Sequence, residues 1–314
     1  MKLVITGALG HIGSKLIRGL APDVWDEVVL IDDLSSQRYC SLFGLPPRIP
    51  FRFVEADVCR DDAERELDGA NVVIHLAAIT NAAGSFDRQQ EVERVNLHGT
   101  ERVAELCART GAKLIFLSTT SVYGPQSELV DETASIDDLN PQSPYADSKL
   151  RAERHLAELG ATRDLRFVTL RFGTIFGPSI GMRFHTAINK FVWQACAGLP
   201  ITVWTTALHQ RRPYLDLEDG VRALQFVIDS DRFDREIYNV LTLNATVADV
   251  LEVIRAAIGT EPAIEYVDSP IMNQLSYNVS RDKFSRLGFE FRGDLARAVA
   301  ETVAMLRGAF SASR

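Results

Sequence analysis

The sequence is poor in the features that mark disulfide-stapled, membrane-spanning and nucleic-acid-binding proteins. Its four cysteines are widely spaced and form no Cys-x-x-Cys pair, so we expect free thiols in a reducing compartment. No apolar run reaches the roughly 18 residues that a membrane helix needs. The formal net charge is −8 and no run of Lys and Arg exceeds two residues, which argues against a nucleic-acid groove or a membrane-binding surface.

The start of the chain argues against a signal peptide, and the spacing of the histidines argues against a metal site. The first apolar stretch begins at residue 3 and meets a glycine after four residues, which is too short for a signal peptide. We therefore expect a cytoplasmic protein. His11, His75 and His98 show no metal-ligand spacing, so no metal site is predicted.

Short apolar runs alternate with amphipathic segments through the first half of the chain. This alternation predicts an α/β fold with a doubly wound parallel sheet buried on both faces. The predicted strands are 3–6, 28–31, 51–54, 72–76, 113–117 and 167–170, and helices are predicted at 91–109 and 144–159.

The regular alternation of strands and helices ends after about residue 175, where the predicted strands become shorter and less regular. A helix at 218–230 and a strand at 237–240 would return to the first sheet. We therefore predict one domain made of 1–175 plus 214–241. A smaller, mixed α/β domain would comprise 176–213 plus 242–314.

Three glycines, Gly7, Gly10 and Gly13, follow the first strand and open a helix. Such a loop permits a tight turn, a close approach of the backbone to a pyrophosphate, and close packing of helix on strand. Free N–H groups at the helix N-terminus favour the anion. Asp32 ends the next strand, where a carboxylate accepts hydrogen bonds from the adenosine ribose and repels a 2′-phosphate. The pattern predicts a dinucleotide site that prefers NAD to NADP.

A hydroxyl and a Tyr–Lys pair follow later in the chain. Thr119 ends the fifth predicted strand, and Tyr145 and Lys149 lie four residues apart on one face of the next helix. Ser143 can cap that helix, with Pro144 at its first position. A Tyr–Lys pair alone is usually a solvated helix face, but here it follows a nucleotide fingerprint and a hydroxyl at a strand end.

With these motifs the chain resembles the extended short-chain dehydrogenase/reductase superfamily, in its NAD-dependent nucleotide-sugar epimerase/dehydratase branch, which includes UDP-glucose 4-epimerase. The resemblance runs from residue 1 to about 260. It implies a Rossmann-type NAD domain, a smaller domain for the nucleotide sugar, and a homodimer formed through helices near 95–109 and 145–159. Tyr145 would be the acid/base, Lys149 would bind the nicotinamide ribose and lower the pKa of Tyr145, and Thr119 would bind the reacting hydroxyl.

The resemblance also implies contacts for the two ligands. For NAD these are the three glycines, Asp32, Tyr145 and Lys149, together with His11, Ile12, Asp57, Val58, Ala77, Ala78 and Asn96. For the sugar nucleotide they are Ser85, Thr120, Ser121, Thr174, His185, Asn189 and Arg212, with Lys190 as a further possibility. Arg212 is the candidate for the diphosphate, because a guanidinium suits bidentate phosphate contact. Pro213 replaces the aspartate that is usual in the family, and Thr174 replaces a frequent asparagine.

These residues predict an NAD-dependent nucleotide-sugar epimerase that inverts C4 through a transient 4-keto sugar. A dehydratase or a 4-keto-sugar reductase of the same family is the alternative among enzymes. In the 4,6-dehydratases that the chain resembles, Asp and Glu follow the strand-end Thr, whereas this chain has Thr120 and Ser121. Asp131 and Glu132 would be the first carboxylates to suspect if elimination occurs. An NAD-binding regulatory protein without catalysis is the alternative of another class.

Overall fold

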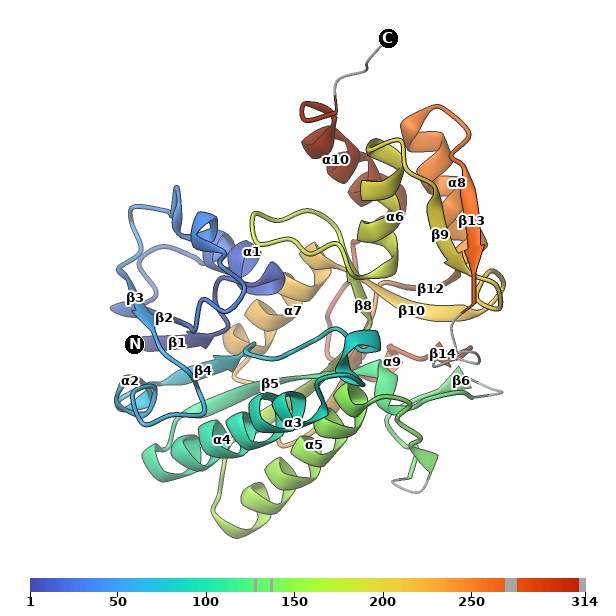
Figure 1. Ribbon diagram of the computed structural model, residues 1–314. Coiled ribbons are helices and arrows are strands. Elements are labelled where there is room, and N and C mark those ends of the chain that lie inside the picture. Colours follow the sequence, from blue (N-terminus) through green and yellow to red (C-terminus); the bar gives the residue numbers. More distant parts are fainter. Residues whose placement is uncertain (127–128, 136–137, 269–275, 311–314) are drawn as a thin grey trace.

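The computed structural model describes residues 1–126, 129–135, 138–268 and 276–310 (Figure 1). Its centre is a seven-stranded sheet in the order β11-β7-β5-β4-β1-β2-β3, in which every neighbouring pair is parallel. The strands are β1 (Lys2–Thr6), β2 (Glu27–Asp32), β3 (Phe51–Glu55), β4 (Val72–His75), β5 (Lys113–Thr119), β7 (Phe167–Phe172) and β11 (Ile237–Val240). The predicted α/β class is therefore confirmed.

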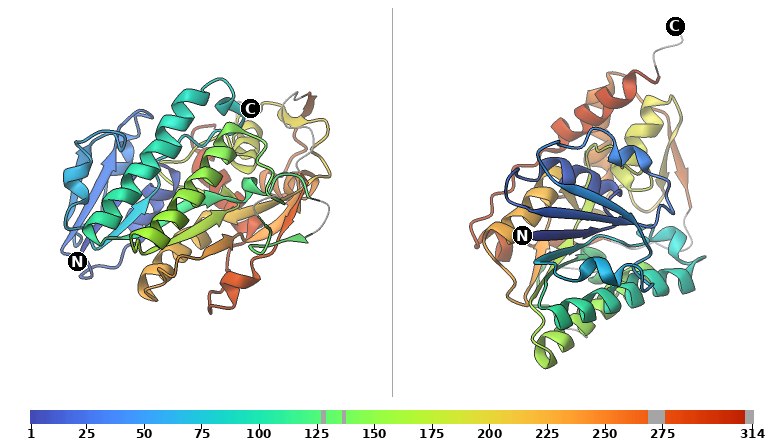
Figure 2. Two further views of the ribbon diagram at one scale, coloured as in Figure 1. Left: turned by 90° about the horizontal axis from the view of Figure 1, so that it is seen from below. Right: turned by 90° about the vertical axis from the view of Figure 1, so that its left-hand side faces the viewer.

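Helices cover both faces of this sheet, so its strands read as continuous apolar runs. Helices α1 (His11–Gly19) and α7 (Leu217–Asp229) pack on one face and form one apolar core with it. On the other face lie α2 (Glu64–Leu67), α4 (Gly99–Thr110) and α5 (Pro144–Thr162), which form a second core. Figure 2 shows the sheet between the two helix layers.

The helix predicted at 91–109 is interrupted. It consists of α3 (Gln89–Val92), a π-helical turn η3 (Glu93–His98) and α4. A π-turn inserts an extra residue into the helix and is frequent at functional sites. Here it carries Asn96, which is fully buried.

The second half of the chain builds a smaller layered unit with its own apolar core. Its three-stranded sheet has the order β12-β10-β8, and two short pairs, β13-β9 and β14-β6, lie beside it. Helices α6, α8 and α10 complete the core (Figure 1). The bounds are β6 (Leu129–Val130), β8 (Thr174–Phe176), α6 (Ala187–Cys196), β9 (Ile201–Trp204), β10 (Arg211–Asp216), β12 (Leu243–Thr246), α8 (Val247–Ile258), β13 (Ile264–Val267), β14 (Asn278–Val279), α9 (Asp282–Ser285) and α10 (Leu295–Arg307).

The chain crosses between the two units more than once. Helix α7 and strand β11 return to the large sheet as predicted. The segment around α9 also returns, because Phe284 and Phe289 pack into the core beneath α7. The periodicity of the sequence gives no sign of this second return. The predicted domain boundaries stay a prediction. No helix in the described part of the chain is long and apolar enough to cross a membrane.

Candidate active site

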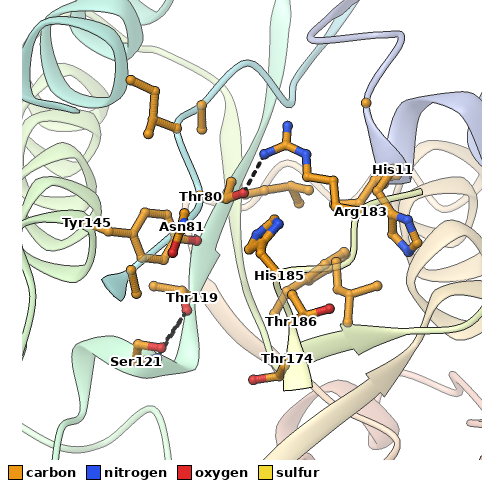
Figure 3. Close-up of a pocket in the computed structure, with 18 of the residues that line it drawn as sticks. His11, Thr80, Asn81, Thr119, Ser121, Tyr145, Thr174, Arg183, His185 and Thr186 are labelled. Atoms are coloured by element: carbon orange, nitrogen blue, oxygen red, sulfur yellow. Dashed lines mark hydrogen bonds between the residues drawn. The ribbon is translucent and has the colours of Figure 1, made fainter. Parts of the chain in front are cut away.

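A cavity of about 620 Å³ lies at the carboxyl ends of the parallel strands, where the smaller unit meets the large sheet. Figure 3 shows side chains from both units pointing into it. Ligands of open α/β sheets bind at this edge. Eighteen of the predicted residues line the cavity: Gly7, Gly10, His11, Ile12, Gly13, Asp32, Asp57, Val58, Ala77, Ala78, Thr119, Ser121, Tyr145, Lys149, Thr174, His185, Asn189 and Arg212.

The glycine loop forms one wall of the cavity, and two of its glycines have no room for a side chain. Gly7 has a φ of 66°, and a Cβ there would lie 2.6 Å from the backbone nitrogen of Ala77. A Cβ on Gly13 would lie 2.3 Å from the carbonyl oxygen of Ala8. Gly10 is the N-cap of α1, so the open N–H groups of that helix face the cavity.

Asp32 stands beside this loop at the end of β2. Its two carboxylate oxygens accept backbone hydrogen bonds from Leu9 and Leu34, each at 3.1 Å. Burial raises the pKa of Asp32, and these two N–H donors oppose the shift. The carboxylate is thereby held in one orientation on the cavity wall.

Thr119, Tyr145 and Lys149 come together from β5 and α5. Ser143 accepts a hydrogen bond from the backbone N–H of Ala146 at 3.2 Å and caps α5 as predicted. The Thr119 hydroxyl lies 3.1 Å from the hydroxyl of Ser121. The ammonium of Lys149 lies over the ring of Phe116, 4.7 Å from its centroid. The tyrosine, the ammonium and the two hydroxyls therefore line one end of the cavity.

The expectation that Lys149 lowers the pKa of Tyr145 when NAD is bound stays a prediction, and the structure without cofactor shows what the charges of Lys149 and NAD must offset. Burial raises the pKa of Tyr145 to about 12, although a hydrogen bond with Thr119 and the charge of Arg183 act to lower it. Burial also lowers the pKa of Lys149 to about 7, although the charge of the Glu153 carboxylate acts to raise it. Both shifts follow from desolvation, which disfavours the charged form of either group.

His75 supports this end of the cavity from beneath. The Thr100 hydroxyl donates to the carbonyl of Asn96 at 2.6 Å, so it accepts from Nε2–H of His75, which lies at 3.0 Å. Nδ1 of His75 then accepts from the hydroxyl of Thr6 at 2.7 Å. Burial lowers the pKa of His75 to about 3. The ring is therefore a neutral structural element.

Three predicted contacts lie behind the wall instead of on it. Asn96 holds the loop after β4 through both backbone groups of Ile79, at 2.7 and 2.9 Å. The hydroxyl of Ser85 donates to the carbonyl of Ala82 at 2.6 Å. The hydroxyl of Thr120 donates to the carbonyl of Phe172 at 3.4 Å. All three are buried and absent from the cavity lining. In this structure they support the wall, and their predicted ligand contacts stay a prediction.

The other end of the cavity is formed by the smaller unit. The guanidinium of Arg212 lies 5.7 Å from the ring centroid of Trp204, and its Nε and Nη2 have no hydrogen-bond partner among the described residues. The hydroxyl of Tyr214 is buried and also unpartnered within the described chain. A buried guanidinium with free donors is suited to an anion such as a diphosphate. Pro213 lies within β10, opposite Asn244 of β12 in the antiparallel register.

Sequence reasoning missed several residues of the lining. Arg183 enters from the loop after β8, Thr80 from the loop after β4, and Tyr277 from the segment before β14. Arg183 lies two residues before His185, which the sequence analysis assigned to the sugar nucleotide, so its charge was the available signal. No local signal marks Tyr277, because only the return of the chain brings it there.

A family model described as the NAD dependent epimerase/dehydratase family matches residues 3–240. The chain belongs to this family. The predicted family is thus confirmed, and this epimerase/dehydratase uses NAD as its cofactor.

Named relatives of this epimerase/dehydratase include both activities. It is 30% identical over 96% of its length to the trifunctional UDP-glucose 4,6-dehydratase/UDP-4-keto-6-deoxy-D-glucose 3,5-epimerase/UDP-4-keto-L-rhamnose-reductase RHM2 of Arabidopsis thaliana, of which it spans about half, 46%. It superposes on the UDP-glucose 4-epimerase of Thermus thermophilus in complex with NAD with a TM-score of 0.85, at 26% identity and coverage of 98% and 100%. For the dTDP-glucose 4,6-dehydratase DesIV of Streptomyces venezuelae the TM-score is 0.87, at 26% identity and coverage of 98% and 97%.

The residues of the cavity fit NAD. Gly10 leaves the backbone open at the N-terminus of α1, where a pyrophosphate binds in this fold, and Nε2 of His11 is buried there without a partner in the described structure. Asp32 presents a carboxylate where the adenosine ribose binds. Within the same described residues, no group of three or more His, Cys, Asp or Glu side chains could hold a metal ion.

Proposed function

We propose that this protein is an NAD-dependent nucleotide-sugar epimerase that inverts C4 of the sugar through a transient 4-keto intermediate. Its family contains epimerases and dehydratases, so the choice between them rests on the site. The observation that supports epimerisation is the chemistry of β5 and α5 beside Tyr145, whose described residues contribute hydroxyls and an ammonium to the cavity lining and no carboxylate.

In this proposal Tyr145 removes the proton of the C4 hydroxyl and later returns it. Thr119 orients that hydroxyl, and Ser121 holds Thr119 by the hydrogen bond between their side chains. When bound, NAD supplies the hydride acceptor and donor and a positive charge beside the phenol. Lys149 adds its ammonium from the same helix face, so that the high pKa of Tyr145 falls toward the working range when both charges are in place.

Arg212 would hold the diphosphate of the sugar nucleotide at the other end of the cavity. Its two unpartnered donors could bind phosphate oxygens in a bidentate manner. Trp204 and Tyr214 line the same end. Fixing the nucleotide there leaves the sugar free to turn between oxidation and reduction, as inversion of C4 requires.

A dehydratase needs a second acid/base pair beside Tyr145, because it must take a proton from C5 and give one to the leaving C6 hydroxyl. Among the described residues, the carboxylates that line the cavity are Asp32, Asp33, Asp57 and Glu91. Asp32 ends β2, and Asp33 and Asp57 follow β2 and β3, on the side of the sheet where NAD is expected. Glu91 lies on α3 and forms an ion pair with Arg88. All four thus belong to elements other than β5 and α5, which carry Thr119 and Tyr145.

The two carboxylates first suspected for elimination are engaged elsewhere. Asp131 accepts from the backbone N–H of Thr133 at 2.8 Å, and Glu132 accepts from the backbone N–H of Asn239 at 2.6 Å. Neither lines the cavity. This placement favours a reaction that leaves the keto sugar intact.

Incubation with a panel of nucleotide sugars in deuterated water, followed by NMR, tests the proposal. We expect a C4 epimer with no solvent deuterium on carbon, and a substrate deuterated at C4 should keep its label in the product. The Tyr145→Phe variant is the control for background chemistry. Deuterium at C5 or a 6-deoxy-4-keto product would show a dehydratase. No turnover of any sugar, despite binding of NAD, would favour the regulatory alternative.

A homodimer formed through α4 and α5 is part of the same proposal. It rests on the resemblance of these helices to the pairing helices of the family. Light scattering during size-exclusion chromatography should give twice the mass of the 34.8 kDa chain. A mass of one chain at micromolar concentration would contradict it.

A further inference from the structure

The loop between β8 and α6 lies directly on the glycine loop that faces the cofactor. We call its residues 179–183 the strap. The hydroxyl of Ser179 donates to the carbonyl of His11 at 3.0 Å, and the N–H of Gly181 donates to the hydroxyl of Ser14 at 2.9 Å. A Cβ on Gly181 would lie 2.4 Å from the carbonyl oxygen of Leu9. The strap is therefore seated on the glycine loop with no room between them.

The strap ends in Arg183, whose guanidinium crosses the cavity (Figure 3). Its Nη1 donates to the hydroxyl of Thr80 at 2.9 Å. Its Nη2 lies 3.9 Å from the point that a Cβ on Gly10 would occupy. Gly10 is the glycine that lets the backbone approach a pyrophosphate. The free side of the guanidinium is thus next to the pyrophosphate position.

Arg183 lies near a second arginine, Arg38, and near buried nitrogen atoms that lack hydrogen-bond partners within the described residues. Among the described residues, no carboxylate forms an ion pair with Arg183. Burial and the neighbouring Arg38 together lower the pKa of Arg183 to about 10, although the Asp32 carboxylate acts to raise it. Nη1 of Arg38 and Nε2 of His11 are buried without partners within the described structure. Like charges with free donors are costly to bury together unless an anion binds between them.

Asn189 binds the backbone at the last residue of the strap and at Gly177, two residues before the strap begins. Its side-chain oxygen accepts from the N–H of Gly177 at 3.3 Å, and its amide group donates to the carbonyl of Arg183 at 3.3 Å. Asn189 is itself buried on α6. The position of the guanidinium is therefore set by the backbone of the strap and not by the side chain alone.

We propose that Arg183 binds the pyrophosphate of NAD from the smaller unit, opposite the N-terminus of α1, so that the strap clamps the cofactor in its site. NAD could then leave only after the strap lifts from the glycine loop. An epimerase needs such retention, because the hydride must return to the same sugar. The inference deepens the proposed function but rests only on the use of NAD, so it can be tested without turnover.

The competing occupant is the diphosphate of the sugar nucleotide, which is also a double anion. Arg212 provides a matched comparison, because it is a second guanidinium that lines the same cavity, with two nitrogens that lack a hydrogen-bond partner among the described residues. The two arginines are expected to serve different ligands. Arg183 should serve NAD because it lies next to Gly10, and Arg212 should serve the nucleotide because it lies on β10 beside Trp204.

Isothermal titration of protein stripped of NAD separates these roles. Arg183→Met should weaken NAD and ADP-ribose by at least about tenfold, the loss of one charge-assisted phosphate contact, and leave UDP within about twofold. Arg212→Met should show the reverse. Arg183→Lys keeps the positive charge but loses the bidentate geometry of the guanidinium, so its affinity for NAD should lie between those of wild type and Arg183→Met. NAD that remains after gel filtration, released by heat and measured by chromatography, should fall in the same order.

A structural role for Arg183 predicts a different result. If Arg183 only supports the fold, Arg183→Met should lower the thermal stability of the protein stripped of NAD. If Arg183 clamps NAD, the stripped variant should be as stable as stripped wild type, and added NAD should stabilise the variant less than wild type. The proposal is overturned if Arg183→Met keeps wild-type affinity for NAD. It is overturned equally if UDP binding falls instead of NAD binding, or if both fall by the same factor.

Discussion

The ion pair behind Lys149 allows a test of how the buried charges of the site are balanced. Glu153 lies one turn after Lys149 on α5 and receives Nε and Nη2 of Arg171 at 3.0 and 2.6 Å. Each side chain is 4% exposed. The guanidinium also lies 4.9 Å from the ring centroid of Tyr123. We predict that Glu153→Gln destabilises the protein strongly.

The magnitude follows from the burial of both partners. Gln keeps the volume of Glu153 but removes its charge, so the guanidinium of Arg171 stays buried without compensation. Breaking a buried pair in this way costs about 3–5 kcal/mol. At roughly 2 °C per kcal/mol for a chain of this size, the Tm should fall by about 6–10 °C. Loss of the carboxylate also removes the group that opposes the low pKa of Lys149, so the activity optimum should move to lower pH.

Calorimetry and urea unfolding of a double-mutant cycle measure the effect. Glu153→Met combined with Arg171→Met should recover most of the stability lost in either single variant, because no unpaired charge remains. Glu261→Gln is the matched control, since its pair with Arg255 is exposed, with side chains 72% and 56% accessible, and should change stability by less than about 1 kcal/mol. The reasoning fails if Glu153→Gln behaves like this control, or if the double variant loses the sum of the two single losses.

Three further predictions concern the reaction, the cofactor and pH. Tyr145→Phe should lower turnover by ~100-fold or more while NAD affinity and Tm stay unchanged; near-normal turnover would refute the acid/base role. The wild-type protein should bind NAD far more tightly than NADP, because a 2′-phosphate adds about −1.5 to −2 charges beside Asp32; equal affinities by calorimetry would contradict this. Burial holds the pKa of His75 at about 3 in the folded protein, below its unfolded value near 6.5. The contribution of the neutral ring to stability is therefore present above pH 6.5 and is lost as the pH falls from 6.5 toward 3. With NAD saturating, the free energy of unfolding should fall less steeply between pH 6 and 4 in His75→Gln than in wild type, by up to about 1.4 kcal/mol per pH unit; identical slopes would show that His75 is protonated in the folded state.

Much of the fold and of the cofactor wall was predictable because its signals are local. Near-continuous apolar runs predict buried parallel strands, and the spacing of Gly7, Gly10 and Gly13 predicts the turn into α1. A separation of four residues puts Tyr145 and Lys149 on one helix face whatever surrounds them. These features depend on backbone geometry within a few residues, which short-range sequence patterns specify.

The tertiary structure decided which of the predicted side chains reach the cavity and how they are charged. Thr120, Ser85 and Asn96 lie behind the wall because nearby carbonyls and amides satisfy their polar atoms. The pKa of Tyr145 is raised in the structure without cofactor because the fold removes the phenol from water. Arg183 meets Gly10 across a long stretch of chain only because the strap packs on the glycine loop. Contacts of this kind arise from close packing between distant segments, and no local periodicity encodes them.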